Sequence, residues 1–142
     1  MLNKSPSGSL CPYYYKGGEL HPLKYGSCFN SRSKLFEVMK AEEAFILKSP
    51  ERHNRRIWVD LYETKLDDAV INALAAHIKA IQEKILRLCF VGCSPFSARK
   101  INKQIVMNQI DIPEPIRFFA DPEKAKEWLV GAGVCTLRSI IE

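Results

Sequence analysis

Strand-like and helix-like segments alternate three times between Arg55 and Val130, and this alternation limits the possible folds more than any other feature of the sequence. Three apolar runs are typical of buried strands: Ile57–Leu61, Ile85–Val91 and Ile116–Phe119. Each run precedes a longer segment with helical periodicity. Because strands joined by crossover helices of this length can pair in parallel, the layout predicts an α/β domain whose sheet is covered by helices.

The residues at which these helices begin support the prediction. Asp67, Ser94 and Asp121 are side chains that can cap a helix N-terminus. Proline follows two of these caps, at the first helical position, where its missing N–H costs nothing. A further helix is predicted earlier in the chain, where apolar residues recur at three- and four-residue steps. The four predicted helices are Ser33–Leu47, Asp68–Glu83, Pro95–Met107 and Pro122–Val130.

An antiparallel hairpin is predicted ahead of the first helix. The aromatic run Tyr13–Tyr15 and the segment Glu19–Tyr25 flank Gly17 and Gly18. A Gly-Gly pair tolerates the positive φ angles of a two-residue turn. Pro22 assigns the second strand to an edge or a bulge, because proline lacks the N–H that a central strand uses.

The size of the chain indicates one domain. With 142 residues, of which 46% are hydrophobic, the chain can bury a core of its own. Residues 1–9 are polar and rich in Ser and Gly, which predicts a flexible tail. We therefore expect a single domain over 10–142, with a mixed sheet of four or five strands and four helices.

The positive charge is concentrated in the first part of the chain. Up to Arg56 there are ten basic and five acidic residues, and beyond it eleven of each. Most of these lysines are scattered, and only Arg52, His53, Arg55 and Arg56 cluster. A solvated loop or a docking site for an acidic protein explains the cluster better than nucleic acid binding, which we do not expect.

The composition also leads to expectations about the cellular compartment and about cofactors. Five cysteines at unlike spacings, with no secretory leader before them, indicate a reducing, cytoplasmic compartment. Cys89 and Cys93 bracket the end of an apolar strand, and at least one of them is expected to be a core residue. His77 lies beside the apolar stripe of its helix and is expected at the helix surface rather than as a ligand. We expect no metal, no other cofactor and no membrane span, because no segment approaches the roughly 20 apolar residues that a span requires.

The order of these elements, together with their local sequence, resembles the STAS domain, the fold of bacterial anti-sigma factor antagonists. The resemblance covers about Tyr13–Val130. Three stretches carry it: Arg56–Leu61 followed by Leu66-Asp67; Leu88–Val91 followed by Ser94-Pro95; and Ile116–Phe119 followed by an acidic helix with Ala125. It implies a STAS-like mixed sheet and a non-enzymatic protein-binding module of a regulatory system.

The resemblance also implies a site in the loop before the second helix. In that family an Asp precedes a Ser or Thr that a partner kinase phosphorylates. Asp67 matches the family's Asp, but Asp68 stands at the phosphoacceptor position and Ala69 follows it, so neither position has a hydroxyl. Asp68 supplies permanently part of the negative charge that a phosphate would add. Two hypotheses follow: the chain is held in a state resembling the phosphorylated form, or the loop has lost phosphorylation switching altogether. Simple helix capping explains Asp67 and Asp68 equally well.

A partner surface follows from the predicted sheet, because the carboxyl ends of parallel strands gather ligands. The residues expected to contact a partner are Thr64, Asp67, Asp68, Ala69, Ser94 and Ser97. The partner implied by the resemblance is an anti-sigma factor or a kinase-like regulator. A homodimer is left open, as is a small ligand such as a lipid or a nucleotide in the same crevice.

An enzyme is the alternative, because Cys93 and Arg99 have the spacing of the cysteine-dependent phosphatases. A helix N-terminus lowers the pKa of a thiol and binds oxyanions, and an arginine forms bidentate hydrogen bonds with phosphate. However, the intervening loop has no glycine, Pro95 removes one amide, and Lys100 stands where a hydroxyl would be expected. We therefore expect a protein that is not an enzyme.

Overall fold

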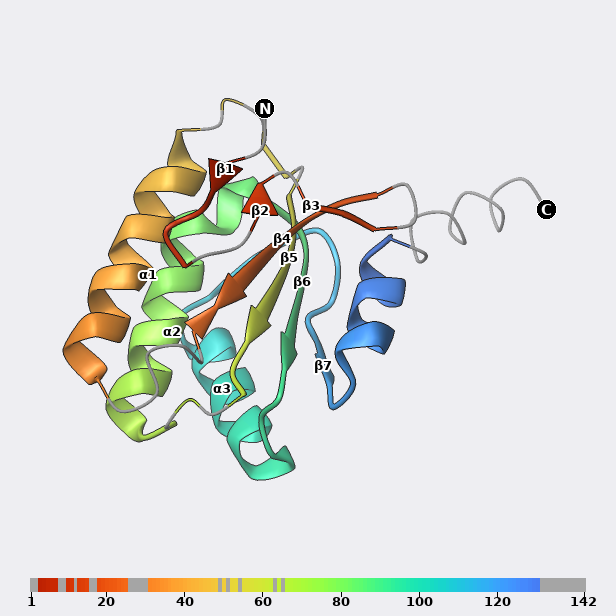
Figure 1. Cartoon of the computed structure of the whole chain (residues 1–142). Helices are drawn as coiled ribbons and strands as arrows, with labels where there is room; N and C mark the ends of the chain where they lie inside the picture. Colours follow the sequence, from red (N-terminus) through yellow and green to blue (C-terminus); the bar gives the residue numbers. More distant parts are fainter. Residues whose placement is uncertain are drawn as a thin grey trace.

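A five-stranded mixed sheet lies at the centre of the molecule (Figure 1). The structure, a computed structural model, describes residues 3–7, 10–11, 13–15, 18–25, 31–48, 50, 52–53, 55–62, 64 and 66–130. The strands, in their order across the sheet, are β3 (Tyr13–Tyr15), β4 (Gly18–Lys24), β5 (Arg55–Asp60), β6 (Ile85–Val91) and β7 (Arg117–Phe119). β3 and β4 are antiparallel, and the other neighbouring strands are parallel. The predicted α/β fold is therefore confirmed, with five strands in the sheet.

Helices cover both faces of the sheet (Figure 1), and residues of three of them belong to the core of one face and residues of a fourth to the core of the other. The three are α1 (Arg32–Leu47), α2 (Asp68–Ile81) and α3 (Pro95–Met107). A helix over 122–130 packs on the opposite face. The four predicted helices are confirmed, although α2 ends at Ile81 and continues as the 3-10 turn η2 (Gln82–Lys84).

The two faces carry separate apolar cores, because side chains alternate along each strand. On the face of α1 to α3, the central-strand residues Ile57 and Leu88 are fully buried. On the other face, Trp58 and Cys89 pack against Leu129 of the helix over 122–130. Cys89 is fully buried, so the prediction that at least one of Cys89 and Cys93 is a core residue is confirmed.

Proline at position 22 fits the strand pairing. β4 pairs with β3 only over Gly18–Leu20 and with β5 over His21–Lys24. Pro22 therefore lies beyond the hairpin ladder, on a stretch of β4 that extends past its pairing with β3, and it is buried. The predicted turn residue Gly17 lies outside the described residues.

Part of the N-terminal segment, for which a flexible tail is predicted, contacts α1. Residues 3–7 are described, and Asn3–Lys4 (β1) pairs with Leu10–Cys11 (β2) in a small second sheet. Ser5 and Ser7 are buried, and both donate hydrogen bonds to the carboxylate of Glu42 in α1, at 2.7 and 2.9 Å. These two bonds dock the segment against the domain, which composition alone did not indicate.

A buried carboxylate joins α1 to the sheet. Glu42 is fully buried and also lies 3.1 Å from Nε2 of His21, whose Nδ1 lies 2.8 Å from the guanidinium of Arg55. An arginine only donates, so Nδ1 of His21 accepts and its Nε2–H donates to Glu42. Burial raises the pKa of Glu42, but the hydrogen bonds from His21, Ser7 and Ser5 outweigh burial and leave the pKa below its ordinary value.

The next residue, Glu43, joins α1 to α2 in a similar way. Its carboxylate accepts from Nδ1 of His77 at 2.9 Å, and Nε2 of His77 meets the hydroxyl of Tyr25. The hydrogen bond from His77 lowers the pKa of Glu43, against the opposing effect of burial. His77 is buried, with an exposed fraction of 1%, so the prediction of a surface histidine is wrong. Tyr25 and Glu43, which come from distant parts of the chain, supply the partners that make its burial acceptable.

Within the described residues, no helix combines the length and the apolar character that crossing a bilayer requires.

Candidate functional site

The loops that follow β5, β6 and β7 meet at one rim of the sheet. The amide of Leu61 donates to the carbonyl of Val91 at 2.8 Å, and the amide of Gly92 donates to the carbonyl of Phe119 at 3.3 Å. The hydroxyl of Tyr62 reaches the carbonyl of Ala120. The loops at the carboxyl ends of these strands therefore converge, as expected from the predicted parallel pairing, and they do so after Leu61 and Gly92.

Glycine is required at position 92 of this rim. Its φ angle is +90°, in the region that residues with a side chain rarely adopt. A Cβ atom there would lie 2.8 Å from both the ring and the backbone nitrogen of Tyr62. The small size of Gly92 thus lets the loop after β5 approach the loop after β6.

Asp67 caps α2, which is the structural role that the sequence left open. Its carboxylate accepts from the amide of Val70 at 2.9 Å, and it also forms an ion pair with Arg32 of α1. Asp67 therefore fixes the start of α2 and connects it to α1.

Asp68, at the first position of α2, points away from the core. Its side chain is 83% exposed and lies 3.1 Å from the ammonium of Lys100 on α3. The same ammonium lies 4.9 Å from the ring centre of Phe96, which is 66% exposed. Ala69 beside Asp68 is exposed as well. An exposed carboxylate, an exposed aromatic ring and a lysine thus lie together where α2 and α3 begin.

A groove continues from this group between α2 and α3. Its volume is about 290 Å³, and its lining residues are Asp68, Ile71, Asn72, Lys100, Lys103 and Gln104. The lining is mostly polar, so the groove suits the side chains of a protein partner better than an apolar ligand.

The other predicted contact residues are divided between the surface and the interior. Ser94 is exposed and caps α3, since its hydroxyl accepts from the amide of Ser97 at 3.1 Å. Thr64 is half-buried, and its hydroxyl oxygen is shielded from solvent with no hydrogen-bond partner among the described residues.

The residues of the phosphatase alternative lie on either side of the start of α3. Cys93 is half-buried against the core, and burial raises the pKa of its thiol. A nucleophilic cysteine needs a lowered pKa, because the thiolate is the reactive form. Arg99 is exposed on α3.

The basic cluster of the sequence does not form a single patch. Arg52 pairs with Glu83 at 3.3 Å, and His53 lies 3.0 Å from the carbonyl of Ile85. Arg55 points to His21 on one face of the sheet, whereas Arg56 follows the strand alternation to the other face. These four side chains diverge, so the cluster offers no continuous track for a phosphate backbone.

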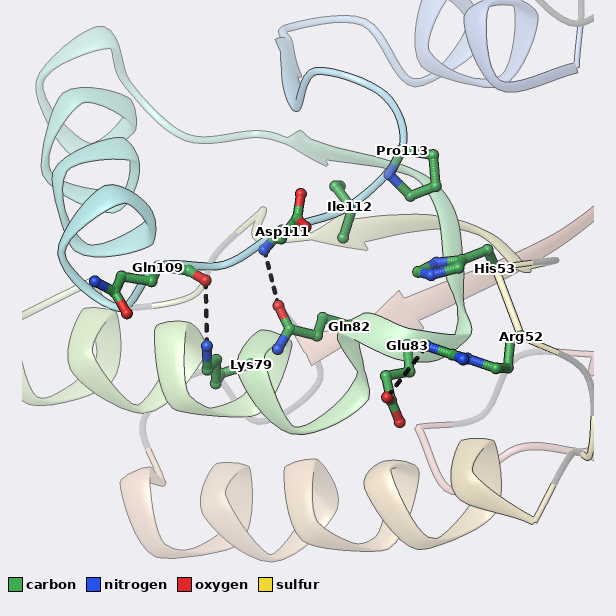
Figure 2. Close-up of a pocket in the computed structure, with 9 residues that line it drawn as sticks. All are labelled: Arg52, His53, Lys79, Gln82, Glu83, Gln109, Asp111, Ile112 and Pro113. Atoms are coloured by element: carbon green, nitrogen blue, oxygen red, sulfur yellow. Dashed lines mark hydrogen bonds and ion pairs between the residues drawn. The ribbon is translucent and has the colours of Figure 1, made fainter.

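A second pocket, at the opposite end of the sheet, was not indicated by the sequence (Figure 2). Its volume is about 420 Å³, and it is lined by Arg52, His53, Lys79, Gln82, Glu83, Gln109, Asp111, Ile112 and Pro113. Several of its polar groups bond to one another: Lys79 donates to the carbonyl of Gln109 at 3.2 Å, and Gln82 accepts from the amide of Asp111 at 2.8 Å. These contacts fasten the loop before β7 to α2 and η2, so the walls of the pocket have a structural role.

Among the residues that the structure describes, no three His, Cys, Asp or Glu side chains are grouped so as to hold a metal ion. Comparison of the chain with models of protein families, with curated proteins and with solved structures gave no match.

Proposed function

We propose that the chain is a cytoplasmic, non-enzymatic protein-interaction module, similar to the STAS domain of anti-sigma factor antagonists. Its partner surface is the rim formed by the start of α2, the start of α3 and the loops before them. The observation that carries the proposal is the juxtaposition of exposed Asp68 with exposed Phe96 at this rim. The five-stranded sheet with its four helices is consistent with the STAS-like architecture.

The chemistry of the surface supports a protein partner. Interfaces combine an aromatic anchor with a polar rim. Here Phe96 is the anchor and contacts Lys100, and the adjacent groove adds the polar side chains of Asp68 and Lys103. The partner class inferred from the resemblance is an anti-sigma factor or a kinase-like regulator. Such a partner would meet a fixed negative charge at the position where related domains are phosphorylated.

The permanent charge of Asp68 is the functional difference from a switchable domain. The N-terminus of α2 favours a negative charge, and Lys100 compensates only part of it, because the ion pair is exposed to solvent. We infer that the surface is held in the state that phosphorylation produces in related domains. Replacement Asp68→Ser tests this inference, since it restores a hydroxyl. If the purified partner with ATP adds one phosphate to the variant and none to the wild type, as read by intact mass, the inference holds. An unmodified Asp68→Ser chain would indicate that the switch has been lost altogether.

The absence of enzymatic activity is proposed on the basis of Cys93. Because burial raises the pKa of its thiol, little thiolate forms near neutral pH. We expect no hydrolysis of an aryl phosphate above the rate of a Cys93→Ser variant. A rate that depends on Cys93 would support the phosphatase alternative instead.

The partner surface is tested by affinity capture from a lysate of the cells that express the chain. Three baits are compared: wild type, Asp68→Lys and the charge-matched control Glu37→Lys, which alters an exposed residue of α1 away from the rim. We expect one regulatory protein to be retained by wild type and by Glu37→Lys and lost by Asp68→Lys. Equal retention by all three baits would contradict the proposed surface.

A further inference from the structure

Unpaired hydrogen-bond donors gather on the face of the sheet that the helix over 122–130 covers. Within the described residues, five buried side-chain atoms have no hydrogen-bond partner. Three of them lie on this face: Nε of Arg56, Nε1 of Trp58 and Nε of Arg87. All three are N–H groups, so the unsatisfied capacity on this face is donor capacity only.

The register of the strands brings these donors together. Arg56 of β5 is paired directly with Arg87 of β6, and Trp58 with Cys89. Arg56 and Trp58 are two positions apart on one strand, so their side chains lie on the same face as that of Arg87. Arg87 has an exposed fraction of 6%, and Trp58 has the same fraction. Buried donors from neighbouring positions of two paired strands therefore lie on one face of the sheet.

A third arginine increases the positive charge of this region. Arg117 of β7 is paired with Cys89, and its guanidinium lies 5.7 Å from the ring centre of Trp128. The guanidinium of Arg87 lies 5.4 Å from the same ring. The carboxylate of Glu114 lies 3.4 Å from Nη1 of Arg87 and is 42% exposed, so it offsets the charge of one arginine only in part.

On the opposite face of the sheet, a buried polar group has hydrogen-bond partners within the chain itself. There the carboxylate of Glu42 accepts from Ser5, Ser7 and His21. Leaving a buried cationic donor unpaired is costly, whereas an oxyanion would satisfy several such donors at once. A phosphate group carries more negative charge and more acceptor oxygens than a carboxylate, so it matches several cationic donors better.

We propose that Arg56, Trp58 and Arg87, with Arg117 at the edge, form a binding site for the phosphate group of a small ligand. The guanidinium groups supply charge and paired donors, and the indole N–H of Trp58 supplies a neutral donor. The site lies on the sheet face opposite α1 to α3 (Figure 1) and is independent of the proposed partner rim.

Tryptophan fluorescence gives a direct test, because the two tryptophans of the chain, Trp58 and Trp128, both belong to this region. The full chain is titrated with inorganic phosphate and, separately, with glycerol phosphate, at constant ionic strength and with acetate as the carboxylate control. We expect a saturable change with phosphate and a rise in melting temperature along the same titration. Acetate should produce neither. Tighter binding of glycerol phosphate would assign the site to a phosphorylated small molecule, and equal binding would assign it to free phosphate.

Three variants locate the response. Arg56→Gln and Arg117→Gln should each weaken phosphate binding at least tenfold, whereas Arg52→Gln, which removes the same charge from an exposed position outside the site, should leave it unchanged. Because Arg117 is exposed, Arg117→Gln should remain folded even if Arg56→Gln does not. The proposal is overturned if phosphate gives no saturable response in the wild type, or if Arg52→Gln weakens it as much as Arg117→Gln.

Discussion

Two pairs of neighbouring carboxylates in this chain have opposite surroundings. Glu42 and Glu43 lie in α1, where one is fully buried and the other is largely covered, and each meets a histidine from another element. Asp67 and Asp68 lie where α2 begins, where one caps the helix and the other is 83% exposed. The sequence presents both as adjacent acidic residues, and the structure separates them.

The difference shows which negative charges are available to a partner. The acceptor capacity of Glu42 is used by Ser5, Ser7 and His21, so this carboxylate contributes to folding. Asp68 contacts one exposed lysine, in an ion pair of the kind that adds little to stability. Substitution of Glu42 should therefore change stability strongly, and substitution of Asp68 hardly at all.

The largest loss of stability is expected for Glu42→Ala. It removes the acceptor of three buried donors, so we expect the free energy of unfolding to fall by about 3 kcal/mol. Urea denaturation followed by circular dichroism measures the change. The control Glu37→Ala, at an exposed position of the same helix, should stay within about 0.5 kcal/mol of wild type. A loss of stability in Glu42→Ala no larger than in the control would remove the distinction between the two pairs.

A smaller effect is expected when the same carboxylates are titrated. The pKa values of Glu42 and Glu43 lie below their ordinary value of 4.5 in the folded chain. Between the folded and unfolded pKa values the unfolded chain binds more protons, so this contribution is complete above about pH 4.5 and is lost as the pH falls through the folded values. Urea midpoints between pH 3 and pH 6 should fall toward acid in the wild type and less steeply in Glu42→Gln. Parallel pH profiles would show that Glu42 does not titrate differently on folding.

The helix cap is expected to contribute less again. Asp67→Ala removes the acceptor for the amide of Val70, so we expect a loss of about 1 kcal/mol. Asp67→Asn keeps an acceptor at this position and should lose only a few tenths of that amount. Thermal unfolding of the two variants distinguishes the cap from the exposed ion pair with Arg32, because both substitutions remove the charge.

The smallest change in stability is expected for Asp68→Asn. Its exposed pair with Lys100 and its place at the helix N-terminus are together worth at most about 0.5 kcal/mol. The urea midpoint should therefore stay close to that of wild type. A loss as large as that of Asp67→Ala would mean that Asp68 belongs to the fold rather than to a partner surface.

Most of the fold could be predicted because its signals are local. Asp67 and the Ser94-Pro95 pair mark helix starts within a few residues, and the apolar run Ile57–Leu61 indicates a buried strand. The short strands β1 and β2 carry no such signal. They depend on Ser5 and Ser7 reaching Glu42, more than thirty residues away in the sequence.

The site was predicted in part for the same reason. Parallel pairing fixes which loops converge, so the meeting of the loops at Leu61 and Gly92 followed from the strand order. The burial of His77 could not be predicted in this way, because it depends on Tyr25 and Glu43, which lie 52 and 34 residues away in the sequence. A signal for Glu42 was present, since it falls on the apolar stripe of α1 between Met39 and Ile46, where a solvated carboxylate is not expected.

The donor-rich face could not be predicted from sequence. Arg56, Arg87 and Arg117 are separated by about thirty residues each, and only the register of β5, β6 and β7 brings them to one face. Periodicity assigns a face to each arginine but does not show whether an acceptor lies opposite.

The partner rim is tested most directly by mapping the amide chemical shifts of the isotope-labelled chain as the captured partner is added. We expect the changes to concentrate at residues 66–70 and 94–100, and to disappear in Asp68→Lys while persisting in Glu37→Lys. Changes concentrated instead around the pocket of Figure 2 or on the helix over 122–130, with the rim unaffected, would contradict the assignment of this surface.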